Sequence, residues 1–408
     1  MSDKRGKSRS GSDECPRDGR AVAARRAASR KHVTGGRGSC RAAAVLSSKR
    51  NRSLVSPRPA FLGFPMAIVS ALFAFCCLAF TGSSAHAQAP NIRYGEAVPR
   101  DVREMYDRGL QFLASTQTEK GDWQGGSDQG PGGTGLCLMA FLASGEDPNF
   151  GLYVNQIRKA LRAIIRDQNA QTGYLGNSMY HHGFGMLALA EAYGVVDERN
   201  LWPDGKPPRS IGVALELAVR AAITSQKKNP LGAWRYSPDS NDADTSVSGS
   251  VLVGLLAARN AGIEVPDEAI DKAINYFKQM TSGNGQVAYS GLGFDDSLAR
   301  VSIGTLVYSI GRRKDLPEFE RALGFLKQRL EQQSGNWAEY TRYYQAQALF
   351  QGDVDAWEKW NKLLIRQLKQ MQQQNGSFKG SMGGPSIDTS MSLLALALNY
   401  RFLPIYER

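Results

Sequence analysis

Residues 108–123, RGLQFLASTQTEKGDW, decide the fold of this chain. The stretch joins a basic residue, Arg108, to a glutamine nine residues later and then to a Gly-x-Trp turn. Similar segments recur five more times, and the glycines of the six turns are Gly121, Gly173, Gly232, Gly285, Gly335 and Gly376. These glycines stand 41 to 59 residues apart. Self-similarity at such a period is typical of repeat proteins, in which each repeat is one supersecondary unit.

Each turn is followed by an apolar segment rich in Ala, Gly and Leu, in which apolar residues recur every three or four positions. This spacing predicts helices. The predicted helices cover Thr134–Ser144, His182–Tyr193, Thr245–Asn260, Ser297–Ile310, Thr341–Gln351 and Thr389–Tyr400. Three of them begin with residues that favour a helix N-cap, in Asp244-Thr245-Ser246, Asp296-Ser297 and Asp388-Thr389-Ser390.

The two helices of each repeat differ in character. The helix after the turn is apolar nearly all round, so we expect it to be buried on every side. The helix before the turn is amphipathic, with Arg, Lys and Gln on its polar face. Six such pairs predict an all-α (α/α)6 toroid, a double ring with the six apolar helices inside. An open solenoid is the alternative, but it would leave the inner helices half exposed.

The net charge of +12 comes from one end of the chain. Of 50 basic and 38 acidic residues, 16 basic and 4 acidic residues lie within 1–87, and they account for the whole excess. Residues 88–408 are therefore neutral, which argues against nucleic acid as a partner. We expect residues 1–58 to be a disordered basic leader, 59–87 a signal peptide or anchor, and 88–408 the toroid domain.

The segment from Pro59 to Asn91 contains no charged residue. Its apolar centre has the length of a signal-peptide core, and Ala85-His86-Ala87 matches a cleavage site. The sequence therefore predicts a secreted or periplasmic protein, cleaved after Ala87. The alternative is a protein anchored to a membrane by residues 60–80, because the uncharged stretch is long enough to span a bilayer. An uncleaved leader would be its only predicted contact with a membrane.

The six units resemble the QW repeat of the squalene-hopene and terpenoid cyclases and of the protein prenyltransferase β-subunit. Residues 108–123 match the repeat position by position, whereas Leu217, Thr281 and Leu330 replace expected residues in other copies. The chain also resembles secreted prenyltransferase/squalene-oxidase-repeat proteins. In the family, the Gln and the aromatic ring tie adjacent helix pairs together. The resemblance thus implies structural roles for Gln117, Trp123, Gln168, Gln226, Trp234 and Trp337.

The resemblance to class II cyclases implies a proton donor in an Asp-x-Asp-Asp-Thr motif that opens an inner helix. The matching stretch is Asn241–Thr245, NDADT, with Ala243 at the donor position. Asp242 and Asp244 remain as candidate catalytic residues, because two neighbouring carboxylates can share a proton. The alternative is that Asp244 caps the helix and Asp242 is a loop residue.

The resemblance to prenyltransferases would imply zinc held by Asp, Cys and His. Cys137 is the only cysteine of residues 88–408, and Gly135 stands two residues before it, where the family has Asp. We therefore expect Cys137 to be a core residue and predict no metal or cofactor. The chain also has no Gly-Cys-Gly-Glu-Gln stretch for thioester chemistry.

Ring geometry brings all six junctions between a turn and an inner helix to one rim. His182 stands there and is a third candidate catalytic residue, as an acid or base, although it could instead cap the helix or bond a loop. The candidate cavity residues on this rim are Tyr180, His181, Tyr236, Asp296, Tyr340, Arg342 and Asp388. Aromatic rings beside carboxylates suit a cationic ligand or a sugar, unless the rings only plug the centre.

Two functional classes stay open from the sequence. The first is a binding toroid that holds an apolar, isoprenoid-like small molecule, a peptide or a protein partner in its central cavity. The second is an enzyme, either a divergent terpenoid cyclase using Asp242 or Asp244, or a carbohydrate-active toroid. In a polysaccharide lyase of this kind, His182 would be the base and Arg342 the neutralising cation.

Overall fold

The computed structural model describes residues 98–406 apart from 125–128, 204, 206–207, 292, 333–334, 336 and 382. The predictions for the leader (1–58) and for the signal segment (59–87) therefore concern residues outside the described part. Among the described helices, none is long and apolar enough to cross a lipid bilayer.

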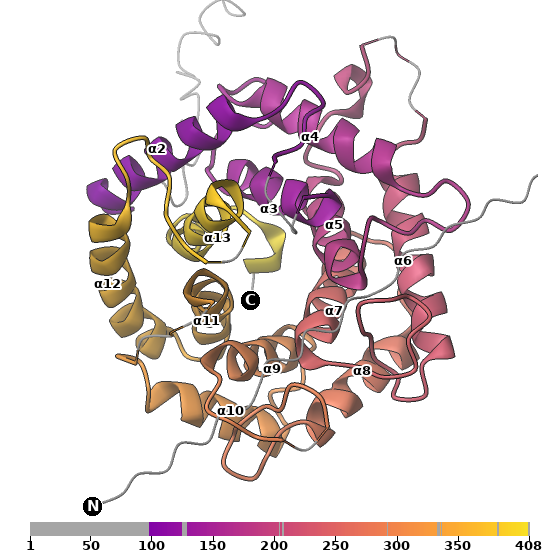
Figure 1. Cartoon of the computed structure of the whole chain (residues 1–408), viewed down its shortest axis with the longest axis vertical. Helices are drawn as coiled ribbons and strands as arrows, with labels where there is room; N and C mark the ends of the chain where they lie inside the picture. The colour runs from indigo at the N-terminus through magenta and orange to yellow at the C-terminus, as the bar shows by residue number, and fades with distance from the viewer. Residues whose placement is uncertain are drawn as a thin grey trace, which may run out of the picture. The chain divides into compact units, whose positions relative to one another are not determined.

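Twelve α-helices alternate between an outer and an inner ring in the described part of the chain (Figure 1). The outer helices are α2 (Arg100–Thr116), α4 (Val154–Asp167), α6 (Ile211–Lys228), α8 (Asp267–Gln279), α10 (Pro317–Lys327) and α12 (Val354–Met371). The inner helices are α3 (Pro131–Leu142), α5 (Met179–Ala192), α7 (Thr245–Asn260), α9 (Leu298–Ile310), α11 (Ala338–Gly352) and α13 (Pro385–Leu396). Short 3-10 turns are η3 (Glu198–Asn200), η4 (Ala397–Asn399) and η5 (Pro404–Tyr406).

The inner ring is closed. Each inner helix packs against the next, and α13 packs against α3, where the Cys137 thiol lies 3.8 Å from the carbonyl oxygen of Ser386. Every residue of α3 is buried, as expected for a helix that is apolar on all sides. The (α/α)6 toroid is therefore confirmed, and so is the core position of Cys137.

Four glutamines join neighbouring repeats with the same geometry, and we call them the clamp glutamines. The side-chain amide nitrogen of each donates to its own turn glycine and to the first turns of the next outer helix. Gln117 binds the carbonyls of Gly121 and Gln156, both at 3.0 Å. The other three pairs of acceptors are Gly173 with Ala214 for Gln168, Gly232 with Ala269 for Gln226, and Gly376 with Met105 for Gln372. The last clamp closes the outer ring from α12 to α2.

The turn glycines explain why the repeat needs this residue. Gly121 and Gly173 have φ of 91° and 76°, a backbone conformation that L side chains rarely adopt. A Cβ on either would also collide with the carbonyl oxygen of Lys159 or Leu217 in the next outer helix. The turn therefore packs its bare backbone against the following repeat.

The fifth repeat keeps the turn glycine and the tryptophan of this pattern in sequence but lacks their contacts. Leu330 stands where the clamp glutamine is expected, and no described atom lies within 4 Å of a Cβ placed on Gly335. Trp123 and Trp234 are buried and donate their indole N–H to carbonyls of Leu113 and Ala222, but Trp337 is 53% exposed. The structural role predicted for Trp337 is thus wrong. We call the junction between the fifth and sixth repeats the seam.

Two sequence predictions about helix starts need correction. The helices α3, α5, α11 and α13 begin three or four residues earlier than predicted. Pro131 and Pro385 suit the first turn of α3 and α13, and Ser178 caps α5. As a result Asp388 lies inside α13 and is not its N-cap. The caps predicted at Asp244 and Ser297 are confirmed.

Candidate functional site

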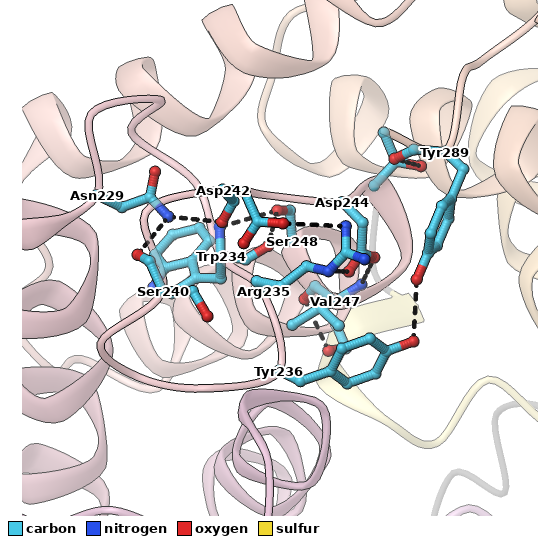
Figure 2. A network of polar contacts seen from close by, with 12 residues as sticks. Asn229, Trp234, Arg235, Tyr236, Ser240, Asp242, Asp244, Val247, Ser248 and Tyr289 are labelled. Carbon is cyan, nitrogen blue, oxygen red and sulfur yellow. Dashed lines mark hydrogen bonds and ion pairs between the residues drawn. The ribbon is translucent and has the colours of Figure 1, made fainter. Parts of the chain in front are cut away.

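The ring end where the inner helices begin carries most of the predicted site residues, and we call it the mouth. Arg235 is the centre of its most polar part, in the loop between α6 and α7 (Figure 2). The guanidinium lies 3.6 Å from a carboxylate oxygen of Asp242 and 3.5 Å from one of Asp244. It also lies over the rings of Tyr236 and Tyr289, 5.6 and 5.3 Å from their centres. The two tyrosine hydroxyls are 3.0 Å apart.

The loop that presents these groups is held by hydrogen bonds to its backbone groups. The side-chain amide of Asn229 donates to the carbonyls of Ser240 and Asp242, at 3.1 and 2.9 Å. The amide of Trp234 donates to the hydroxyl of Ser248 at 3.0 Å. The amide of Asp244 donates in turn to the carbonyl of Trp234 at 3.1 Å. Arg235 and Asp244 are therefore fixed relative to each other before any ligand arrives.

Asp244 caps α7 and is completely buried. One oxygen of its carboxylate accepts the backbone N–H of Val247 at 2.8 Å, and the other faces Arg235. Burial raises the pKa of Asp244 to about 6, although the Val247 N–H and the Arg235 charge both favour the ionised form. At neutral pH the group is therefore mainly a carboxylate that is paired with a guanidinium.

Aromatic side chains meet across the centre of the inner ring, below the mouth. The helices α5 and α11 lie on opposite sides of that ring. The ring centres of Tyr180 and Tyr340 are 6.2 Å apart, and those of Phe184 and Tyr343 are 5.9 Å apart. Tyr344 packs edge-on against Tyr340. We call these five residues the aromatic floor, and burial raises the pKa of Tyr340 to about 12.

The floor leaves little space on one side of the centre. The cavity between Leu136, Phe184 and Met391 has a volume of about 10 Å³, which is room for a single water. At the opposite end of the ring, the C-terminal segment is bound by inner helices. Ile405 donates its N–H to Glu191 and accepts from Gln351, both at 3.4 Å.

The predicted base His182 is placed in a structural position. It is completely buried, its Nδ1 accepts the N–H of Leu175 at 3.0 Å, and its Nε2 lies 3.0 Å from the carbonyl of Ala218. Ser248 and Thr389 accept the same turn N–H in the third and sixth repeats. Burial lowers the pKa of His182 to about 4, so the ring is neutral. Its geometry matches the alternative in which it bonds a neighbouring loop.

The remaining predicted residues do not form one site. Arg342 bonds Glu339 at 3.0 Å and faces α12, so it is not beside His182 and the two do not form the base and cation of a lyase. Asp388 accepts the N–H of Gly380 at 3.2 Å. Asp296 is exposed and accepts from Gln286 at 2.6 Å, while Asp295 pairs with Arg300. His181 is buried at the start of α5 and lines the small central cavity together with Tyr180.

Sequence reasoning missed Arg235 and Glu339. Arg235 directly follows the repeat's Gly-x-Trp turn and precedes two aspartates at a helix start, which is a signal for an ion pair at the mouth. Glu339 is 3% exposed and bonds both Arg342 and the N–H of Ser381. Nothing in the sequence distinguishes it from a surface glutamate, because it lies in a segment with no visible period.

No protein-family model and no curated protein matches the chain. Solved structures nevertheless share its fold. The apo type II terpene cyclase MstE from Scytonema superposes with a TM-score of 0.54 at 16% identity, over 74% of this chain and 99% of the cyclase. A variant of that cyclase bound to geranylgeranyl dihydroxybenzoate gives 0.52 at 15% identity, over 74% and 98%. The GH76A α-1,6-mannanase from Salegentibacter sp. HEL1_6 gives 0.53 at 9% identity, over 72% and 98%. At these identities the similarity shows the α/α toroid fold alone.

Proposed function

We propose that this chain is an exported α/α toroid that binds a peptide segment at its mouth, above the aromatic floor. One contrast supports this function. The charged groups Arg235, Asp244 and Arg342 are paired inside the protein, whereas aromatic rings at the same end stay exposed. The exposed fractions are 53% for Trp337, 50% for Tyr236 and 38% for Phe294. Exposed aromatic rings are typical anchors for a binding partner.

A peptide fits these features better than an isoprenoid. An isoprenoid needs a long apolar chamber, and the contacts between Tyr180 and Tyr340 and between Phe184 and Tyr343 cross the centre where it would lie. A peptide can lie across the mouth and place apolar side chains on Tyr236 and Trp337. The exposed carboxylates of Asp242 and Asp296 would favour basic residues in the same segment.

The cyclase alternative is less well supported by the geometry. The donor position of the resembling motif is Ala243, which is 3% exposed. Asp244 is the buried carboxyl beside it, but its hydrogen bond to the Val247 N–H and its contact with Arg235 match the role of a helix cap. A group with a pKa of about 6 is also too weak an acid to protonate an alkene efficiently.

One specific observation supports the carbohydrate alternative. Asp295 and Asp296 are adjacent aspartates at the start of α9, and a variant of the GH76A mannanase with two adjacent aspartates replaced by asparagine is described as inactive. In this chain Asp295 pairs with Arg300 and Asp296 with Gln286, so neither is poised over an open cavity. We keep this reading as the second candidate.

Selection of peptides from a displayed library would test the proposal. We expect peptides rich in apolar and basic residues, with at least tenfold weaker binding to Tyr236→Ala and Trp337→Ala variants. Phe150→Ala is the matched control, because Phe150 is 87% exposed but follows α3 at the opposite end of the ring. Peptides that bind both mouth variants as well as the wild type would contradict the proposal.

Native mass spectrometry with two further ligands separates the alternatives. Retention of geranylgeranyl dihydroxybenzoate would favour the cyclase-like class, and retention of α-1,6-mannotriose would favour the carbohydrate class. Loss of mannotriose in an Asp295→Asn variant would then assign that binding to the α9 pair. With the proposed function, neither compound is retained by the wild-type protein.

Export can be tested on its own by N-terminal sequencing of the protein recovered from its producing cells. We expect the mature chain to begin at Gln88. A chain that keeps residues 1–87 and sediments with membranes would replace export by anchoring through residues 60–80, without affecting the peptide proposal.

A further inference from the structure

A cavity lies at the end of the ring opposite the mouth, and we call it the rear recess. Its volume is about 670 Å³, within the range of roughly 300–1,000 Å³ that is typical of small-molecule sites. Its walls come from the ends of α7, α9 and α11, from the loop between α9 and α10, and from η5. The rear recess is separate from the mouth, because the mouth lies where the inner helices begin and this cavity lies where they end.

The backbone takes a left-handed conformation two or three residues after several inner helices. Glycine holds this position after α3, α5 and α7, as Gly145, Gly194 and Gly262, with φ of 85°, 78° and 89°. Glycine is the residue that adopts this conformation without strain, which is why it commonly follows a helix. After α9 the position is held by Arg312, with a φ of 58°. The fourth repeat therefore keeps a long basic side chain at the cost of a strained backbone.

Arg401 shows the same conformation with a visible structural reason. It follows η4 with a φ of 60°, and its guanidinium lies 5.0 Å from the ring centre of Phe350. The side chain of Arg312 makes no hydrogen bond, ion pair or ring contact within the part of the chain that the structure describes. Arg312 is exposed and lines the rear recess. Residues held in such conformations cluster at binding sites, where the strain serves a function.

The other charges of this loop have partners inside the protein. Arg313 pairs with Asp315 at 3.2 Å, and Lys314 donates to the carbonyl of Gln351 near the end of α11 at 2.5 Å. A cation near the end of α9 also interacts favourably with the helix dipole, but Arg313 and Lys314 supply this charge without a strained backbone. The guanidinium of Arg312 is thus available to an anion.

The rest of the lining indicates the kind of anion. A carboxylate can accept two parallel N–H bonds from a guanidinium. The ends of α7 and α9 carry partial negative charge, which disfavours a ligand with two negative charges, such as a phosphate monoester. Asn260 is exposed at the end of α7 and adds an amide, while Ile310 and Ile405 add apolar surface.

We propose that the rear recess is a second binding site, for a small organic compound with one carboxylate, an amide and a short apolar group, such as an acylated amino acid. The carboxylate accepts from Arg312, and the amide of the compound bonds the side chain of Asn260. The apolar group packs against Ile310 and Ile405. The site exists in the fourth repeat because an arginine stands there where three other repeats have glycine.

Isothermal titration calorimetry on the whole protein can test this site with two matched probes. N-acetylleucine carries the carboxylate, and N-acetylleucinamide differs only in having a neutral amide in its place. We expect N-acetylleucine to bind the wild type at least about tenfold more tightly than the amide, because its bonds to the guanidinium are charge-assisted. Arg312→Gly should abolish this preference without lowering the melting temperature, because glycine suits the backbone there. Arg401→Gly is the matched control, with the same change at the same conformation, and should keep the preference.

A second variant tests the site through its charge. Asn260→Asp keeps the size of the side chain and places a carboxylate in the rear recess, so it should weaken binding of N-acetylleucine at least about fivefold through like-charge repulsion. The thermal melting curve shows whether this variant is folded. Equal affinity of the wild type for the two probes would overturn the proposal. So would unchanged binding of N-acetylleucine to Arg312→Gly, and a lower melting temperature with that result would assign Arg312 to the end of α9 instead.

Discussion

The junction between the first two repeats and the seam contain the same sequence positions, but the packing differs at three of them. At the first junction, Gln117 bonds two carbonyls, Gly121 packs its backbone against α4, and Trp123 is 2% exposed. At the seam the corresponding positions hold Leu330, a glycine with no described atom within 4 Å of an added Cβ, and an indole that is 53% exposed.

This difference separates residues that hold the ring together from residues that are free for another role. In the clamped repeats, the glutamine and the turn glycine occur together with a buried side chain two residues after the glycine, which is Trp123, Leu175, Trp234 or Phe378. The described residues of the seam make none of these three contacts. The ring still closes there, because the inner helix α11 packs against α9 and α13. Packing of the inner helices therefore stabilises the ring where the clamp and turn contacts are absent. The residues of the seam outside the inner ring are thus less constrained by the fold.

The two tryptophans at equivalent positions give the largest expected difference. Trp234→Ala removes a completely buried side chain and its bond to the Ala222 carbonyl, so we expect a loss of about 4 kcal/mol in the free energy of unfolding. Trp337→Ala should change it by less than about 0.5 kcal/mol, because that side chain is half exposed. Urea denaturation measures both, and equal losses would place Trp337 with the structural tryptophans.

The turn glycines provide the next comparison. Gly173→Ala places a Cβ against the backbone of Leu217 at a φ of 76°, and we expect a loss of about 3 kcal/mol. No described atom lies within 4 Å of a Cβ placed on Gly335, so its surroundings are open. Gly335→Ala should therefore be neutral or stabilise by about 0.5 kcal/mol through the unfolded chain. A loss at Gly335 as large as that at Gly173 would show that the seam packs like a regular junction.

The fold could be predicted from the sequence because its signals are local and repeated. The pattern from Arg108 to Trp123 fixes a helix, a clamp and a turn, and six copies imply a ring. The helix starts were less predictable, since Pro131 and Pro385 extend their helices by a turn that the apolar period does not show. The same repetition gave a wrong prediction for Trp337, because the sequence match does not reveal that its side chain is exposed.

A regular junction can also be changed into a copy of the seam. Gln372→Leu puts at the closing junction the residue that the seam has, and it removes bonds to the carbonyls of Met105 and Gly376. We expect a loss of about 2 kcal/mol, because these partly buried acceptors lose their donor. Gln374→Leu is the control, since that side chain is exposed and should change stability by less than about 0.5 kcal/mol. Equal effects in the two variants would mean that the clamp does not stabilise the ring.

The candidate site was only partly predictable, for a physical reason. The sequence placed Asp242, Asp244 and Tyr236 on one rim, and the structure brings them together around Arg235. It could not show that His182 points away from the centre, toward α6. Neighbouring residues of an inner helix can point either to the centre or to the outer ring, and the sequence alone does not tell which. Whether a side chain at the mouth holds the ring together or is available to a ligand therefore depends on whether it points toward the outer ring or toward the centre.

Asp244 tests that assignment with the smallest expected effect. Asp244→Ala removes the cap of α7 and should cost about 1 kcal/mol, while Asp244→Asn keeps an acceptor for the Val247 N–H and should cost less. The folded-state pKa of about 6 lies above the ordinary value of 3.8, so the native state binds the proton more tightly. This stabilising contribution is complete below about pH 3.8 and is lost as the pH rises through 6. Relative to Asp244→Asn, the wild type should therefore lose stability between pH 4 and 7, as measured by urea denaturation at each pH. If Asp244→Asn instead loses as much free energy of unfolding as Asp244→Ala at pH 7, the negative charge beside Arg235 is what matters. Asp244 would then have a role in the chemistry of the mouth beyond that of a helix cap.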